Sequence, residues 1–122
     1  MPIFVVHRHK ARNLHWDLRL EMKNRAGRKV LKSWAVPKEP PKAKGVKRLA
    51  IQVEDHDFSY RKFEGTIKEG YGKGTVKIWD SGMYKPVSCK RNKMVFTLSG
   101  KKMKGDYVLL KFRGRNWLLF KK

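Results

Sequence analysis

The sequence has few acidic residues and a single cysteine. Ten Asp and Glu face 31 Lys and Arg, which gives a formal net charge of +21. Such a surface favours a polyanion, with nucleic acid as the first candidate and an anionic membrane face as the second. Cys89 excludes an intrachain disulfide and fits a reducing interior, and no cysteine lies nearby to complete a zinc knuckle.

Long apolar runs are also missing. No run approaches the length that spans a membrane, and Met1–Val6 is too short for a signal peptide because Arg8 and Lys10 follow. We therefore expect a cytoplasmic monomer that does not associate with membranes. The 122 residues suit one domain over 1–122. Composition alone favours a basic ribosomal-type protein, but four Trp and six Phe can supply a real core.

A convincing amphipathic helix is absent as well, and short segments of β-branched and alternating residues dominate. They are separated by turns that contain glycine, and Pro37, Pro40 and Pro41 place a basic loop at Lys38–Lys47. We also expect a turn at Asp80–Gly82 and a loop at Pro86–Asn92. About eight strands at this spacing indicate an all-β fold, an antiparallel barrel or sandwich. The predicted strands are Ile3–His9, Leu14–Met22, Lys29–Val36, Arg48–His56, Thr75–Trp79, Met94–Leu98, Tyr107–Phe112 and Asn116–Phe120.

The stretch from His7 to Glu21 carries the clearest chemistry. Its second half alternates strictly, so that one face of a strand is apolar and the other carries His15, Asp17, Arg19 and Glu21. His9 lies just upstream. Two imidazoles and a carboxylate suit a divalent metal, and a mixed set of this kind tolerates manganese as well as zinc. A neighbouring Arg can bind an anionic substrate.

The predicted strand Arg48–His56 has a second polar face. Its alternation places Arg48, Glu54 and His56 on one side, where Arg48 could bind a phosphate together with Arg19. His56 could donate to a phosphate oxygen or protonate a leaving group, and Glu54 could orient an imidazole. The alternative for each of these residues is an ordinary charged surface position.

The glycine-rich stretch and the tryptophans are better explained by structural roles than by roles in a functional site. The glycine-rich stretch Glu69–Thr75 lacks the spacing of a phosphate-binding loop, so we expect bulges and tight turns there. The four tryptophans could stack on bases, but each lies in an apolar run, which favours core packing. They are Trp16, Trp34, Trp79 and Trp117.

Several motifs together resemble one known family, the 3′-phosphoesterase domain of bacterial ligase D, which also occurs as a stand-alone protein. The resemblance runs in order over nearly the whole chain. The matching segments are FVVHRH at 4–9, LHWDLRLE at 14–21, KSWAVPK at 32–38, KRLAIQVEDH at 47–56, FEGTI at 63–67, GYGKGTVKIWD at 70–80 and NWLL at 116–119.

The resemblance implies a compact β-barrel enzyme that heals 3′ ends at a primer–template of DNA or RNA-tipped DNA. It implies a Mn²⁺ cofactor, with Zn²⁺ and Co²⁺ as alternative occupants, and removal of a 3′-terminal ribonucleoside followed by removal of the 3′-phosphate. By motif position, His9, His15 and Asp17 are similar to the family's metal ligands. The phosphate-contacting residues would be Arg19, Arg48 and His56, with Lys38, Glu54 and Tyr60 at further positions that the family uses.

The sequence also departs from the family pattern. Members commonly have Gln at the position of His7, so His7 either alters the metal site or replaces a hydrogen bond. We expect this protein to lack the leader of ligase-linked members, and the resemblance then implies the phosphomonoesterase step more firmly than the phosphodiesterase step. We expect a separately encoded DNA ligase as partner. The alternative function is a catalytically inactive, basic nucleic-acid-binding barrel.

Overall fold

The computed structural model describes residues 2–70 and 73–122. Within these ranges the chain forms nine strands and one short 3-10 helix, which are numbered along the chain. They are β1 (Ile3–Lys10), β2 (Leu14–Lys23), β3 (Lys29–Val36), β4 (Lys47–Asp57), η1 (Phe58–Lys62), β5 (Gly65–Ile67), β6 (Gly74–Cys89), β7 (Lys93–Ser99), β8 (Lys104–Arg113) and β9 (Asn116–Lys121). No helix among these residues is long and apolar enough to cross a membrane.

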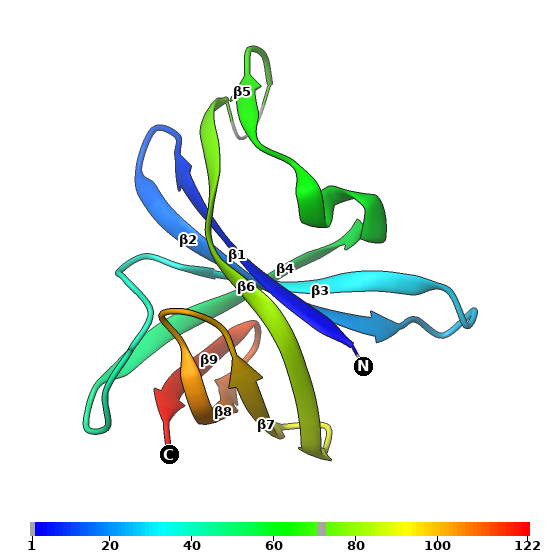
Figure 1. The fold of residues 1–122 in the computed structure, drawn as a ribbon, viewed down its shortest axis with the longest axis vertical. Helices are drawn as coiled ribbons and strands as arrows, with labels where there is room; N and C mark the ends of the chain where they lie inside the picture. The colour runs from blue at the N-terminus through cyan, green and yellow to red at the C-terminus, as the bar shows by residue number, and fades with distance from the viewer. Residues whose placement is uncertain (1, 71–72) are drawn as a thin grey trace.

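The strands form one antiparallel sheet that closes on itself. The order is β1-β2-β3-β4-β9-β8-β7-β6, and β6 pairs with β1 to complete an eight-stranded barrel (Figure 1). Closure leaves these strands without an open edge. β5 pairs with the first residues of β6 and extends the sheet outside the ring. The predicted all-β barrel is therefore confirmed.

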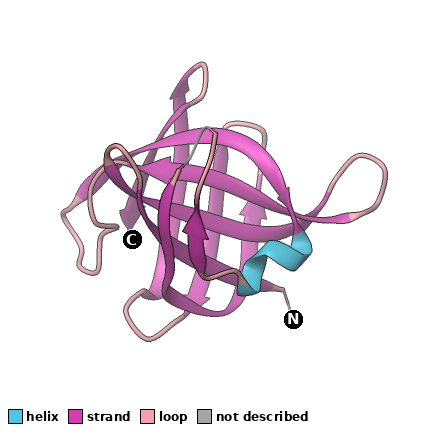
Figure 2. Ribbon diagram, turned by 90° about the horizontal axis from the view of Figure 1, so that it is seen from above, coloured by secondary structure: helices cyan, strands magenta, loops and turns pink. Residues whose placement is uncertain are grey.

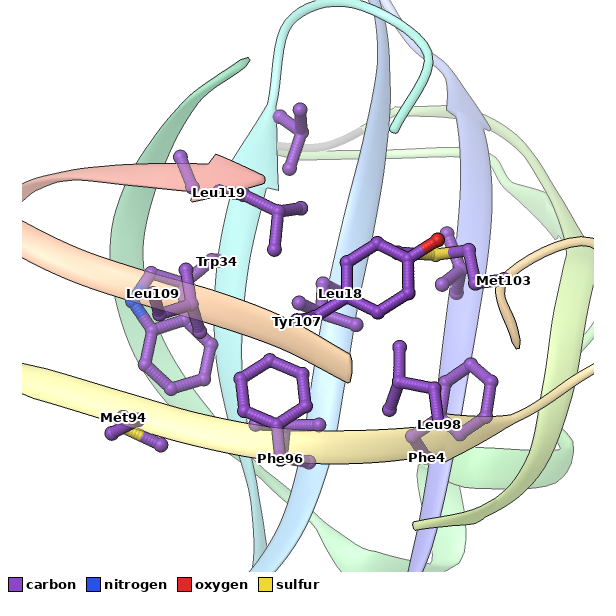
Figure 3. Close-up of a cluster of buried hydrophobic side chains, with 14 of the residues drawn as sticks. Phe4, Leu18, Trp34, Met94, Phe96, Leu98, Met103, Tyr107, Leu109 and Leu119 are labelled. Atoms are coloured by element: carbon purple, nitrogen blue, oxygen red, sulfur yellow. The ribbon is translucent and has the colours of Figure 1, made fainter. Parts of the chain in front are cut away.

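The inside of the barrel is packed with apolar side chains from every wall (Figure 3). Leu18 and Leu20 of β2 are fully buried, so the alternation of this strand does turn its apolar face inward. Burial of each such side chain stabilises the fold by roughly 2 kcal/mol. Three predicted core tryptophans are confirmed as buried, and the fourth, Trp79, is partly buried and packs against the core. The buried three are Trp16, Trp34 and Trp117.

β6 is much longer than its sequence suggests, because the expected turn at Asp80–Gly82 and most of the expected loop after Pro86 lie within the strand. Asp80 accepts hydrogen bonds from the backbone N–H groups of the β7–β8 turn instead of closing a turn of its own. Gly82 is needed for close approach, since a Cβ there would lie 2.3 Å from the carbonyl oxygen of Ser99. Pro86 is accommodated at a register shift in the pairing with β7.

The prediction that Arg48, Glu54 and His56 share one face of β4 is also wrong, because the strand contains a bulge. Val53 pairs with Ser33 and His56 pairs with Leu31, so β4 has one more residue than β3 between these pairs. An extra residue reverses the side on which all later side chains point. His56 therefore faces outward, whereas Arg48 has the parity of Ala50, which is fully buried in the barrel.

A segment that we call the strap, Phe58–Ile67, crosses the outside of the barrel. It consists of η1, two linking residues and β5, and Figure 2 shows its short helix outside the wall of strands. The carboxylate of Asp57 caps η1 by accepting a hydrogen bond from the N–H of Ser59 at 3.0 Å. Gly65–Ile67 pairs with β6, and residues 71 and 72 of the glycine-rich stretch lie outside the described residues.

Candidate active site

The predicted metal ligands meet on the outer face of β1 and β2. His9 pairs directly with His15, and Asp17 is two residues further along β2. One ligand atom from each of the three side chains lies within 4.8 Å of the others. Nε2 of His15 is 3.3 Å from Oδ1 of Asp17, and Nδ1 of His9 is 3.7 Å from Oδ2. Three ligands at bonding distance from one ion are about 3.4 Å apart, so the set fits a divalent transition metal.

We call His9, His15 and Asp17 the metal triad, and its charge state also suits a cation. Burial raises the pKa of Asp17, but the hydrogen bond with His15 and the charge of Arg19 outweigh it, and the pKa lies below its ordinary value. Asp17 is therefore a carboxylate at neutral pH. Nδ1 of His15 lies 3.3 Å from the carbonyl oxygen of Asn13. With Nδ1 donating there, Nε2 is the nitrogen that faces Asp17, and loss of its proton would free its lone pair for a metal.

Arg19 lies beside the triad and is almost completely buried, with 2% of its surface exposed. Its Nε–H donates to Nδ1 of His7 at 2.9 Å, and its Nη2 donates to Oδ2 of Asp17 at 3.3 Å. Nη1 donates to Oγ of Ser33 at 2.8 Å and to Nδ1 of His56 at 3.0 Å. Within the described part of the chain, four of the five guanidinium N–H groups thus have acceptors, and one Nη2 N–H remains.

His56 and Tyr60 also lie against this guanidinium. The ring of Tyr60 covers Arg19, with 5.0 Å between Cζ and the ring centroid, and it lies 4.9 Å from the ring of His56. The ring of Phe63 stacks on the ring of Tyr60, with 4.9 Å between the ring centroids. Burial and the neighbouring charge of Arg19 lower the pKa of His56. His56 is therefore mostly neutral at pH 7. Its Nδ1 lies 3.0 Å from Nη1 of Arg19 and 3.2 Å from the carbonyl oxygen of Glu54, and it accepts from Arg19 in the tautomer that carries the proton on Nε2.

His7 is fully buried at the same place, although the sequence assigned it no role. Its Nδ1 accepts from Arg19, and its Nε2 lies 3.1 Å from the carbonyl oxygen of Phe63 in the strap. Burial, and then the charge of Arg19, lower its pKa to about 4. The two alternatives for His7 were a change in the metal site and a replaced hydrogen bond, and these contacts favour the second.

The side chains of the other predicted site residues do not join this cluster. Arg48 is eight residues from His56 along β4, which is about 25 Å of strand, and its Nε donates to the carbonyl oxygen of Glu39 at 2.8 Å. Its predicted placement beside Arg19 and His56 is wrong because of this separation along β4, and the bulge in addition turns His56 to the opposite face. Glu54 lies at that bulge with an exposed side chain, and its carbonyl oxygen is 3.2 Å from Nδ1 of His56. Lys38 is exposed in the loop after β3.

Glu21, at the far end of β2, has a structural contact. Its Oε1 accepts from the backbone N–H of Ile3 at 3.0 Å, and its Oε2 is 3.7 Å from Nζ of Lys29. It therefore anchors the start of β1 and holds the β2–β3 hairpin.

Two groups in the site were missed by sequence reasoning. Ser33 pairs with Arg19 across β2 and β3, and its hydroxyl donates to the carbonyl oxygen of Leu31 while it accepts from Arg19. Only the register of the two strands could have identified it. The carbonyl group of Phe63 is a backbone group, and no side-chain pattern indicates it.

The known proteins to which this chain is similar share one domain. The family model of the DNA Ligase D 3'-phosphoesterase domain matches residues 7–111. The chain is 42% identical over 127 residues to the Multifunctional non-homologous end joining protein LigD of Mycolicibacterium smegmatis, covering 94% of this chain and 16% of that protein. It is 41% identical over 128 residues to the protein of the same name from Pseudomonas aeruginosa, covering 97% and 15%. The chain thus spans about one sixth of the length of these relatives, and it belongs to the DNA ligase D 3′-phosphoesterase domain family.

Proposed function

We propose that this protein is a Mn²⁺-dependent phosphoesterase that heals the 3′ ends of DNA in repair. It would remove a 3′-phosphate and also a 3′-terminal ribonucleoside, leaving a 3′-hydroxyl. The observation that supports this most directly is the buried Arg19, which donates to Asp17 of the metal triad and to His56 at once. A cation site and a phosphate-binding group are thereby joined through one carboxylate.

The metal would be held by His9, His15 and Asp17, whose mixed nitrogen and oxygen donors suit Mn²⁺. When bound, it would supply Lewis-acid polarisation of a phosphate oxygen. Asp17 is already ionised in the protein, and the contact with Asn13 keeps one ring nitrogen of His15 directed at the triad.

The chain's own groups would act on the phosphoryl oxygens. Arg19 offers its remaining Nη2 N–H, on the nitrogen that also donates to Asp17. In the tautomer in which Nδ1 of His56 accepts from Arg19, the proton of the neutral ring is on Nε2. From there it can donate to a phosphoryl or leaving-group oxygen, and such fixed donors stabilise charge that develops during the reaction.

The substrate would be a primer–template of DNA or RNA-tipped DNA. The net charge of +21 supplies non-specific attraction to the phosphate backbone. The printed names of the relatives describe multifunctional end-joining proteins, which supports a repair context. A DNA ligase would then use the healed end.

The test is release of phosphate from a primer–template with a 3′-phosphate, measured with and without Mn²⁺. We expect Mn²⁺-dependent release by the wild type and a loss of at least about 100-fold for His9→Ala. Lys90→Ala, in the β6–β7 turn, is the control and should match the wild type. Equal rates for wild type and His9→Ala would refute the site. Salt-sensitive DNA binding without any release would support the alternative, an inactive nucleic-acid-binding barrel.

A further inference from the structure

The imidazole of His7 connects the strap to the centre of the proposed site. It is fully buried, Arg19 donates to one of its nitrogens, and the carbonyl oxygen of Phe63 lies beside the other. Its ring also meets the ring of Tyr60 edge-on at 5.3 Å. We infer that His7 is a positioning residue, which fixes the orientation of Arg19 toward Asp17 and His56 and fastens the strap to that arrangement.

The polarity of the two hydrogen bonds defines the state of the ring. Nε of Arg19 is only a donor, so Nδ1 of His7 must be the acceptor. A carbonyl oxygen is only an acceptor, so Nε2 of His7 must carry the proton that is donated to Phe63. His7 is therefore a neutral ring with its proton on Nε2, and it joins one donor to one acceptor on opposite sides.

The bond to His7 has a distinct effect on Arg19. Two of the other contacts, to Ser33 and His56, both converge on Nη1. A planar group that is held mainly at one corner can pivot about that corner. The bond at Nε is a second, well-separated point, and it fixes the plane in which Nη2 faces Asp17. Without it, the remaining Nη2 N–H loses its fixed direction, and small misplacements of a charged donor are costly in a reaction.

Substitutions at His7 can separate this role from simple packing. Gln has an acceptor oxygen and a donor nitrogen on one side chain, so it can make both bonds with the same polarity. Leu fills similar space but leaves the Nε–H of Arg19 and the carbonyl oxygen of Phe63 without a partner. Asn has the polar groups of Gln but is too short to reach both.

The kinetic test rests on the proposed function and uses the primer–template with a 3′-phosphate. For His7→Leu we expect kcat to fall by about 100-fold, the loss typical of one misplaced donor, with KM nearly unchanged. His7→Gln should recover kcat to within about fivefold, and Mn²⁺ affinity by calorimetry should stay within about threefold for both. If His7→Leu does not fold, His7→Asn takes its place with the same expected loss.

A matched variant controls for lost stability. Tyr107→Phe removes a buried hydrogen bond of 2.8 Å to the carbonyl oxygen of Pro41, inside the barrel and away from the site. It should lower the unfolding midpoint while keeping kcat. If Tyr107→Phe and His7→Leu reduce kcat alike, or if His7→Gln is as inactive as His7→Leu, the inference is wrong.

A second measurement does not depend on activity. The ¹⁵N spectrum of the wild-type histidine rings at pH 7 should show His7 neutral, with its proton on Nε2. A proton on Nδ1 would overturn the inference whether or not the protein releases phosphate. If the wild type releases none but the spectrum has the expected form, the proposed function fails while the positioning of Arg19 by His7 stands.

Discussion

Oδ2 of Asp17 lies 3.3 Å from Nη2 of Arg19, so a single carboxylate belongs both to the metal triad and to the buried guanidinium. The pairing of β1 with β2 is what places this carboxylate beside both groups. Arg19 follows Asp17 on the same face of β2, and the strap covers Arg19 while the triad stays toward the β1–β2 turn.

Loss of the Asp17 charge should disable both parts of the site. For Asp17→Asn we expect Mn²⁺ affinity and the rate of phosphate release to fall by at least about 100-fold, because a metal ligand is lost and Arg19 loses a charged acceptor. Calorimetric titration with Mn²⁺ and the release assay measure the two effects. Asp55→Asn, an exposed carboxylate 3.5 Å from Lys32, is the control. Mn²⁺ affinity within threefold of wild type for Asp17→Asn would contradict the assignment.

The ring of Tyr60, and not its hydroxyl group, should support Arg19. The contact is between the guanidinium and the ring, and such contacts contribute about 0.5–2 kcal/mol. We expect Tyr60→Ala to reduce kcat by about tenfold and Tyr60→Phe to retain most of it. Phe58→Ala is the matched control, since Phe58 belongs to the same short helix but packs against Lys29 and Arg61. If Phe58→Ala is as harmful as Tyr60→Ala, the effect belongs to the helix as a whole.

His7 should make the metal-free protein sensitive to acid in a defined range. The pKa of His7 is lowered from 6.5 to about 4 in the folded state, so the unfolded chain binds an extra proton between these values. Stability is therefore lost as the pH falls from about 6.5 to about 4, by up to about 3 kcal/mol from this group. The pKa of His15 is raised in the folded state, so its effect on stability has the opposite sign. The stability that His15 contributes is fully present below its unfolded pKa and is lost as the pH rises.

The measurement is the urea midpoint of the metal-free protein at pH 7 and at pH 4. His7→Gln keeps the two hydrogen bonds but does not titrate, so its midpoint should change less between these values than that of the wild type. An equal change in both proteins would show that other groups are responsible.

The sequence correctly predicted that the side chains of His9, His15 and Asp17 lie together, because this signal is local. Two-residue alternation in β2 fixes the face of Asp17 and Arg19, and a short turn brings His9 opposite His15. The same reasoning failed for β4, where a single extra residue at the bulge separates the face of His56 from that of Arg48. Alternation carries no information about where a bulge falls, because the bulge depends on the partner strand.

The strap was missed for a related reason. Its role depends on a backbone carbonyl group at Phe63 and on the ring of Tyr60, and both act only once the chain has crossed the outside of the barrel. The length of β6 was missed because Asp80–Gly82 has turn-forming residues. In the folded protein, those residues instead meet the β7–β8 turn, through the carboxylate of Asp80 and the close approach of Gly82 to Ser99.

The loop between β3 and β4 should hold the nucleic-acid strand. Asp17 pairs with Ala35, and β3 ends one residue later, so Lys38 follows the end of β3 that lies nearest the triad. Lys44 lies further along the same loop, where it forms a bridge with Lys121 of β9. Both are exposed. We expect Lys38→Glu with Lys44→Glu to raise KM at least about tenfold and to leave kcat nearly unchanged. The slope of log KM against log salt concentration should decrease by roughly 1 to 2, as expected for two lost phosphate contacts.

The same charge change at the opposite end of the barrel is the control. Lys90→Glu with Arg91→Glu alters the β6–β7 turn, which Figure 1 shows away from the β1–β2 turn. Both double variants change the net charge equally, so a general loss of attraction would raise KM alike in the two. A larger effect of the β3–β4 variant places the strand on that loop. Equal effects would mean that the nucleic acid is attracted by the overall charge, and that the terminal phosphate is oriented by the site alone.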